Sequence, residues 1–272
     1  MTHPGTEAPD RRELLALYDA QLRTAPEMVG ATDITRLGPL WMGTFPGGVG
    51  FVSYRGLDGV APADMSGLVE GALTHFRSAG DISEIEWKTR SHDRAPGLEH
   101  ALVAAGFHEG EPESVMVGAA EALALDVGLP PEVTIRRATS AADVRACLHA
   151  LERAFGQATP EHAADDLVSR VEGGDPLMEM WMAETAGTTI GSGRLEVVAD
   201  TDFAGIWGGG MVPEWRGRGI YRAITAARAR SALAAGRRWI QSDSTDMSRP
   251  ILERSGLVRI TETTPWTWTS PR

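Results

Sequence analysis

One short segment of this 272-residue chain is unusual, and it reads Gly208-Gly-Gly-Met-Val-Pro-Glu-Trp-Arg-Gly-Arg-Gly-Ile-Tyr-Arg222. Three glycines at the end of an expected strand indicate a bulge or a close approach by a ligand. Pro213 cannot donate to a strand ladder, so the strand ends there, and helix-forming residues follow from Arg218 to Ala235. The segment is therefore predicted to be a strand, a glycine-rich turn and a helix in succession.

The turn is suited to a negatively charged ligand. Backbone N–H groups at the start of a helix lack partners, and the helix dipole favours negative charge there. Gly217 and Gly219 would let those amides face an anion, and arginines 216, 218 and 222 could add charge-assisted hydrogen bonds. These features predict a binding site for a pyrophosphate.

The rest of the chain argues against several other classes of function. The formal net charge of −11 disfavours nucleic acid and anionic membranes as partners, although residues 215–242 hold seven arginines and no acid. No apolar run approaches the ~20 residues that cross a bilayer, and no apolar signal core opens the chain. A single cysteine, Cys147, and scattered histidines offer neither a disulfide nor a metal site. We expect a cytoplasmic monomer or homodimer without a metal.

The second half alternates between strand and helix patterns. A strand is expected at 133–138, and Thr139 or Ser140 would cap a helix that runs to Phe155 and stops at Gly156. The remaining expected elements are a helix at 162–172, strands at 177–185, 188–198 and 203–212, the helix at 218–235, a strand at 239–242, a helix at 248–255 and a strand at 266–268.

The first half repeats the later part of this order. A helix end at Ala79-Gly80, a strand with Trp87 and the sequence 102–107 precede their counterparts in the second half by 150 to 156 residues. We infer an α/β (α+β) fold of two tandem units, each a mixed, mostly antiparallel sheet flanked by helices. The predicted domains are 1–128 and 129–272, with a linker within 119–131.

The glycine-rich turn resembles the acyl-CoA signature of one known family. A Walker loop and a dinucleotide fingerprint do not fit, because the Gly-Lys-Ser/Thr sequence is absent and an antiparallel meander precedes the turn. Residues 212–224 resemble the Gln/Arg-x-x-Gly-x-Gly/Ala signature of the GNAT superfamily of N-acetyltransferases, and 252–257 are similar to its Tyr-x-x-x-Gly-Phe ending. The two-copy plan, with a degenerate first copy, resembles that of mycothiol synthases.

The resemblance implies how acetyl-CoA would bind. Residues 216–222 would hold the pyrophosphate, and the end of the preceding strand would pair with the pantetheine arm through main-chain groups. Tyr221 stands where the signature has Gly or Ala, so its side chain must point away from the phosphates. The first half lacks the arginines and has Asp64 in this place, so we expect only the second half to bind acyl-CoA. The predicted binding residues are Met211, Val212, Arg216, Gly217, Arg218, Gly219, Ile220, Tyr221 and Arg222.

The catalytic residues are less well marked. Leu252 occupies the position at which many GNAT relatives carry the tyrosine that protonates the leaving thiolate, so Ser248 or Ser244 would replace it. The general base is expected to be a carboxylate, and the strand that leads into the turn carries none. Our predicted catalytic residues are Ser248 and Glu196, with other carboxylates left open as the base: Glu184, Asp243 and Asp246.

The resemblance implies an acetyl-CoA-dependent N-acetyltransferase. A primary amine of a small molecule or a protein would attack the acetyl group directly in a ternary complex, without a metal or a nucleic-acid partner. The missing tyrosine leaves a second reading open, in which the chain is a non-catalytic acyl-CoA-binding or regulatory protein on the same fold.

Overall fold

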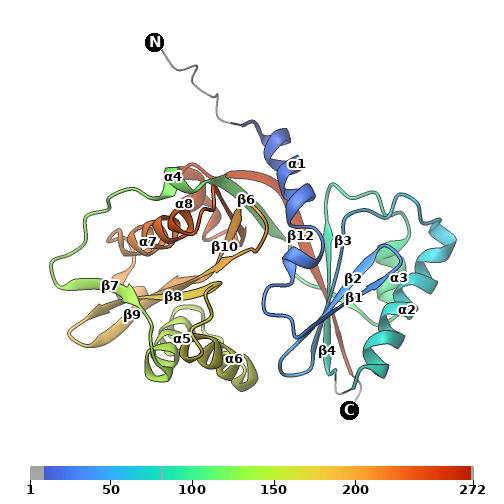
Figure 1. Cartoon of the computed structure of the whole chain (residues 1–272), viewed down its shortest axis with the longest axis horizontal. Coiled ribbons are helices and arrows are strands. Elements are labelled where there is room, and N and C mark those ends of the chain that lie inside the picture. Colours follow the sequence, from blue (N-terminus) through green and yellow to red (C-terminus); the bar gives the residue numbers. More distant parts are fainter. Residues whose placement is uncertain (1–8, 81, 271–272) are drawn as a thin grey trace, which may run out of the picture.

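The strands of the protein form one continuous mixed sheet. The computed structural model describes residues 9–80 and 82–270. The sheet has twelve strands: eleven join in the order β1-β2-β3-β4-β12-β6-β11-β10-β9-β8-β7, and the short β5 pairs with β12 (Figure 1). Helices flank the sheet, so the predicted α/β class with mixed, mostly antiparallel pairing is confirmed.

The first half begins with a helix and a three-stranded meander. Its elements are α1 (Arg11–Gln21), η1 (Ala25–Glu27), β1 (Asp33–Leu37), β2 (Leu40–Phe45), β3 (Val49–Tyr54), η2 (Pro62–Asp64), α2 (Met65–Ser78), β4 (Glu84–Arg90), α3 (Leu98–Ala104), β5 (His108–Glu109), β6 (Glu113–Ala119) and α4 (Ala120–Leu123). The short helix α4 occupies the start of the segment that we expected to be a linker.

The second half contains the elements expected from its sequence. They are β7 (Val133–Arg137), α5 (Ala141–Phe155), α6 (Glu161–Glu172), β8 (Met178–Thr185), β9 (Thr188–Val197), β10 (Phe203–Met211), η3 (Pro213–Trp215), α7 (Ile220–Ala234), β11 (Trp239–Ser244), α8 (Arg249–Arg254) and β12 (Val258–Thr269). The final strand is far longer than the three residues expected from the pattern at 266–268.

Local sequence sets the ends of these helices. Ser140 caps α5, because its hydroxyl accepts a hydrogen bond from the N–H of Asp143 at 3.2 Å. Gly156 ends the same helix with φ +76°. Helix α7 begins at Ile220, two residues later than expected, because Gly219 takes φ +80° at the N-cap.

The two halves repeat one arrangement. In each, an antiparallel meander leads to a helix and then to a strand that pairs in parallel with the last strand of the meander, as β3 pairs with β4 and β10 with β11. A further helix and an antiparallel strand complete each repeat. The repeat inferred from sequence offsets is therefore present in the structure.

The halves exchange their final strands. Strand β6 of the first half lies between β11 and β12, and β12 of the second half lies between β6 and β4. Figure 1 shows β12 as a long red strand that runs from the second half into the first. Because of this exchange, hydrogen bonds of the sheet cross the predicted division at residue 128, and that division stays a prediction.

Two indoles from β12 complete the core of the first half. Trp266 and Trp268 pack with Trp87 and Phe76 in one buried cluster between the sheet and α2 and α3. Trp266 is directly opposite Trp87 in the strand register. Buried aromatic side chains contribute large apolar areas, so the first half depends on the last strand of the chain for its core.

In the described ranges, no helix is long and apolar enough to cross a bilayer.

We expect residues 129–272 alone not to fold into a stable monomer. Without the first half, β11 loses β6, β12 loses β4, and the indoles of Trp266 and Trp268 face water. Far-UV circular dichroism and size-exclusion chromatography measure the outcome, and addition of residues 1–128 should restore a folded 1:1 complex. A folded, monomeric 129–272 fragment would contradict the strand exchange.

Candidate functional site

A glycine bulge separates β10 from β11. The two strands pair only at Phe203–Gly205, although both continue beyond this point. On its other edge β10 shifts register against β9 between Trp207 and Gly210, and Gly208 has φ +54°. A β-carbon at Gly210 would lie 2.7 Å from the Phe155 ring, so a larger residue does not fit. The bulge predicted from the three glycines is confirmed, and it leaves a gap between the strands.

The turn between β10 and α7 presents free backbone amides. Gly217 and Gly219 have positive φ values of +75° and +80°. Across the part of the chain that the structure describes, none of the N–H groups of residues 217–222 donates a hydrogen bond. Consecutive free donors at the positive end of a 15-residue helix favour an anionic ligand.

A cavity of about 590 Å³, the first cavity, lies between this turn and the bulge. Its walls come from β10, the turn, α8 with the segment before it, and Glu113 of β6. All of the predicted binding residues line it except Val212 and Arg218. Four arginine side chains also reach it, which suits an anionic ligand: Arg216, Arg222, Arg228 and Arg254.

The three arginines of the turn have different surroundings. Arg216 donates from Nε to the carbonyl of Met211 at 3.2 Å and from Nη2 to the carbonyl of Ala154 at 2.8 Å, so it ties the strand end to α5. The guanidinium of Arg218 lies 4.5 Å from the centre of the Trp215 ring. Arg222 is exposed and lines the first cavity, and no ion pair or hydrogen bond joins its side chain to another described residue. Arg222 is therefore the arginine of the turn that is most available to a ligand.

The end of β10 has fewer free main-chain groups than the sequence suggested. The N–H of Val212 donates to the carbonyl of Ile190 at 3.0 Å, and its carbonyl accepts from the N–H of Trp215 at 3.0 Å. Val212 thus has partners within the chain on both sides. The bulge residues Gly208 and Gly209 do line the first cavity. Their main-chain groups, and those of the residues directly after them, are therefore the ones with which a ligand could pair.

A buried arginine supports the bulge from the α7 side. Arg228 is 1% exposed and donates to the carbonyls of Arg194 and Trp207 at 3.2 and 3.4 Å. Burial lowers the pKa of Arg228, and Tyr221 nearby opposes this effect. A β-carbon at Gly209 would lie 2.9 Å from the Tyr221 ring and 3.3 Å from the Arg228 guanidinium, so both side chains lie against the bulge.

The two predicted catalytic residues line different cavities. Ser248 lines the first cavity and donates from its hydroxyl to the carbonyl of Thr245 at 3.3 Å. Glu196 lines a second cavity, where its carboxylate lies 2.8 Å from Arg170 Nη1 and 3.3 Å from Arg194 Nε. These roles stay predictions. Leu252, at the position of the usual tyrosine, is 1% exposed in the apolar core.

Of the carboxylates left open as bases, Asp243 reaches the centre of the site. It lines both cavities, lies 2.9 Å from Lys88 Nζ and accepts from Gln241 Nε2 at 2.7 Å. Glu184 instead pairs with Arg136 at 2.6 Å, and the exposed Asp246 pairs with Arg249.

The second cavity, of about 220 Å³, lies where the two halves meet. The first half supplies most of its wall, from α1, η1, β2, β3 and β4. Trp207 and Asp243 line both cavities, so a ligand in the second cavity would lie next to the gap between β10 and β11. The first cavity has the cationic turn, and the second has carboxylates: Glu27, Glu86, Glu196 and Asp243.

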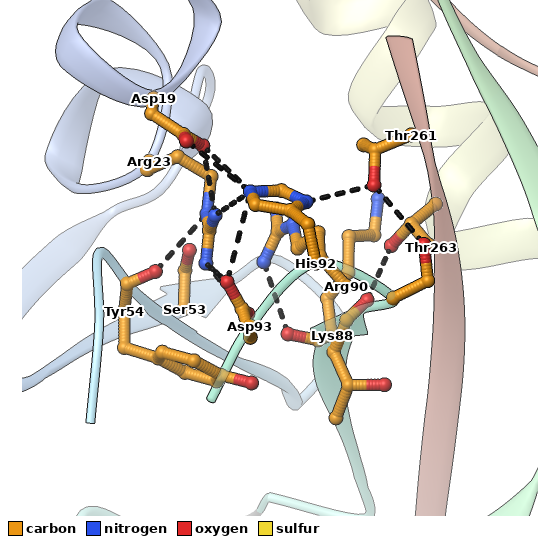
Figure 2. A network of polar contacts seen from close by, with 12 residues as sticks. Asp19, Arg23, Ser53, Tyr54, Lys88, Arg90, His92, Asp93, Thr261 and Thr263 are labelled. Carbon is orange, nitrogen blue, oxygen red and sulfur yellow. Dashed lines mark hydrogen bonds and ion pairs between the residues drawn. The ribbon is translucent and has the colours of Figure 1, made fainter. Parts of the chain in front are cut away.

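Buried ion pairs fix the N-terminal helix over this cavity. Figure 2 shows Arg23 between Asp19 and Asp93, at 2.9 and 2.8 Å, and His92 between Asp19 and Thr261. Arg23 is fully buried, and the two carboxylates of Asp19 and Asp93 compensate its charge. This network holds the segment that carries Tyr18 and Glu27 on β3 and β4.

A second arginine, Arg90 of β4, also binds the segment that carries Tyr18 and Glu27, at a place closer to the cavity. The Nε of Arg90 donates to the Tyr18 hydroxyl at 3.3 Å, and its Nη2 pairs with Glu27. The Glu27 carboxylate also accepts from the Ser53 hydroxyl. Glu27 is thus held in place on the cavity wall by groups from β3 and β4.

The carboxylates around Lys88 and their burial change the pKa values in this group. Burial alone would lower the pKa of Lys88, but Asp243 and Glu86 outweigh it and raise that pKa above its ordinary value. Burial raises the pKa of Glu86, with Lys88 opposing and Glu27 adding to the effect. Burial also raises the pKa of Glu113, with a further contribution from Asp243. Carboxyl groups with a raised pKa in a cavity are suited to proton transfer.

Sequence analysis did not predict Glu86, Lys88 or Glu113 as site residues. They belong to the half that lacks the turn, and only the exchange of β6 and β12 brings them beside β10 and β11. A repeat alignment pairs β4 with β11, but it does not indicate that their side chains meet at one cavity.

Comparison with known proteins identifies the fold. No family model matches the chain, and no curated protein matches it. A GCN5-related N-acetyltransferase from Kribbella flavida has TM-score 0.64 at 17% identity, over 89% of this chain and 91% of that one. A similar enzyme from Sphaerobacter thermophilus has TM-score 0.58 at 17% identity, over 85% and 76%. A tandem GNAT protein from the clavulanic acid biosynthesis pathway has TM-score 0.55 at 13% identity, over 98% of both chains.

The chain has the GNAT fold. The match to a tandem GNAT protein over the whole chain agrees with the repeat of the two halves. At these identities the likeness establishes the fold alone, and the finer resemblance to mycothiol synthases stays a prediction.

We expect Glu86→Gln to raise the free energy of unfolding at neutral pH. The raised pKa of Glu86 means that the folded protein holds the carboxyl proton more tightly than the unfolded chain, so stability is lost as the pH rises from 4.5 toward the folded value. Glutamine is neutral throughout, so the gain should appear above this window and vanish below it.

Denaturant unfolding on both sides of that window measures the effect. Glu84→Gln is the matched control, because Glu84 is exposed on the same strand and should change the stability little at either pH. A stability difference for Glu86→Gln that stays constant with pH would contradict the raised pKa of Glu86.

Proposed function

We propose that the protein is an acetyl-CoA-dependent N-acetyltransferase that transfers an acetyl group to a primary amine. The observation that carries this proposal is the row of free amides at 217–222, which opens onto a cavity beside two diverging strands. The GNAT fold of the chain supports it.

Acetyl-CoA fits the first cavity by charge and by shape. The amides of 217–222 and the side chain of Arg222 would hold the pyrophosphate, and the other arginines of the cavity add positive charge. The pantetheine arm would pass through the gap beside Gly208 and Gly209, which brings the thioester to the junction of the two cavities near Trp207 and Asp243. Backbone amides at the bulge would polarise its carbonyl.

The transfer requires a free amine at this junction. The Glu113 carboxylate takes a proton from the acceptor's ammonium group, and the amine nitrogen then attacks the thioester carbon. A C–N bond forms and the C–S bond breaks. The attacking nitrogen then gives up its second proton and the thiolate takes up one, and the Ser248 hydroxyl in the same cavity is the proposed relay, which donates its proton to sulfur as it receives the one from nitrogen. Glu196 is engaged in ion pairs with Arg170 and Arg194, so we assign it to the wall of the acceptor cavity and not to proton transfer.

A non-catalytic acyl-CoA-binding protein is the alternative, and the buried Leu252 in place of tyrosine favours it. Release of the CoA thiol from acetyl-CoA during a screen of amines separates the two readings. Turnover with any amine supports the transferase, whereas tight binding of acetyl-CoA without turnover across the screen supports the alternative.

We expect Arg222→Glu to weaken acetyl-CoA binding about tenfold to a hundredfold, because it replaces a charge-assisted hydrogen bond by repulsion. Titration calorimetry measures the affinity. Arg230→Glu is the matched control, because Arg230 is exposed on the same helix and lies outside the first cavity. Equal affinities for the two variants would contradict the assignment of the turn.

We expect Glu113→Gln to lower kcat by about a hundredfold or more while the affinity for acetyl-CoA changes little. The amide cannot accept the proton, so the acidic limb of the pH–rate profile should also be lost. Steady-state kinetics over a range of pH test both outcomes. An unchanged kcat with an unchanged profile would exclude Glu113 as the base.

A further inference from the structure

The junction of the two cavities contains more carboxylates than cations. Lys88 lies 2.9 Å from Asp243, and Arg90 pairs with Glu27. Two further carboxylates, Glu86 and Glu113, belong to the same group, because the charges of Lys88 and Asp243 act on both of them and the charge of Glu86 acts on Glu113. The junction thus contains four carboxylates and only two cationic side chains.

Neighbouring charges do not supply the missing cations. Arg170 and Arg194 are matched by Glu196 and by Asp175, which lies 2.8 Å from Arg170. The buried Arg23 is matched twice, by Asp19 and by Asp93.

The two unmatched carboxylates line different cavities, and Asp243 of the Lys88–Asp243 pair lines both. Glu86 lines the second cavity, and Glu113 lines the first. Among the described residues, the only cation within ion-pair distance of Glu86 is Lys88, at 3.9 Å, and Lys88 already pairs with Asp243 at 2.9 Å. Glu113 forms no ion pair with any described residue. A ligand that spans the junction therefore meets one unmatched carboxylate at each end.

The second cavity is small and has aromatic walls. Its volume of about 220 Å³ is less than half of the 590 Å³ of the first cavity, so it suits a compact group. Four aromatic side chains line it, and faces of such rings attract cations: Tyr18, Phe45, Phe51 and Trp207. Aromatic walls with an unmatched carboxylate form a site for an organic ammonium group.

We propose that the acceptor is a compact diamine, whose distal ammonium group binds Glu86 in the second cavity while its reacting amine lies beside Glu113 at the junction. This inference rests on the proposed acetyl transfer and specifies its acceptor. A burial-raised pKa for both carboxylates agrees with it, because it shows that the protein itself does not neutralise them. Glu86 is then a binding residue that the degenerate first half contributes to the site of the second.

The test compares two acceptors that differ only in the distal charge. The full chain is given acetyl-CoA with 1,4-diaminobutane or with 4-aminobutan-1-ol, and kcat/KM is measured by release of the CoA thiol. We expect the diamine to be preferred at least about tenfold, because its second ammonium gains a charge-assisted bond to Glu86. Glu86→Gln should remove the preference, and the exposed control Glu84→Gln should keep it. Equal kcat/KM values for the two acceptors, or a preference that survives Glu86→Gln, would overturn the proposal.

A binding measurement separates this inference from the proposed function. Calorimetry follows 1,4-diaminobutane as it binds to the full chain saturated with CoA, and so requires no turnover. Binding that is weakened about tenfold by Glu86→Gln and is not weakened by Glu84→Gln supports the diamine site even if no acetyl transfer is observed. Turnover of monoamines without any such binding retains the transferase and rejects the diamine site.

Discussion

The exchange of β6 and β12 is the constraint on which the site depends. Because β6 lies between β11 and β12, Glu113 reaches the cavity formed by the second half, and because β12 lies against β4, Lys88 and Glu86 face Asp243 across the junction. The first half therefore supplies a wall of the site, although it has lost the turn that would bind a cofactor. Its buried ion pairs around Arg23 and Arg90 hold that wall in position.

The second constraint is the divergence of β10 from β11. Gly208 allows it by its positive φ of +54°, and side chains at Gly209 and Gly210 would collide with Tyr221 and Phe155. The gap connects two cavities of different character, with arginines and free amides in the first and a cluster of carboxylates in the second. An anionic cosubstrate and a cationic acceptor would each be attracted to its own side, and they would meet at the glycine bulge.

The sequence predicted the features that depend on a few neighbouring residues. It did not predict those that depend on the pairing of strands far apart in the chain. The limits of α5 followed from Ser140 and Gly156, and the bulge and the turn followed from their glycines. The length of β12 was underestimated, because the partners of residues 258–265, β6 and β4, lie more than a hundred residues away. For the same reason Glu86, Lys88 and Glu113 were missed, whereas Ser248 and Asp243, close in sequence to the turn, were named.

The most direct test of the account is amide hydrogen exchange with and without CoA. If the diphosphate of the cofactor binds the free amides of α7, exchange at residues 217–222 should slow markedly when CoA is added, and exchange at the matching turn of the first half, 59–66, should not change. Unchanged exchange at 217–222 in the presence of saturating CoA, or equal protection at 59–66, would contradict it.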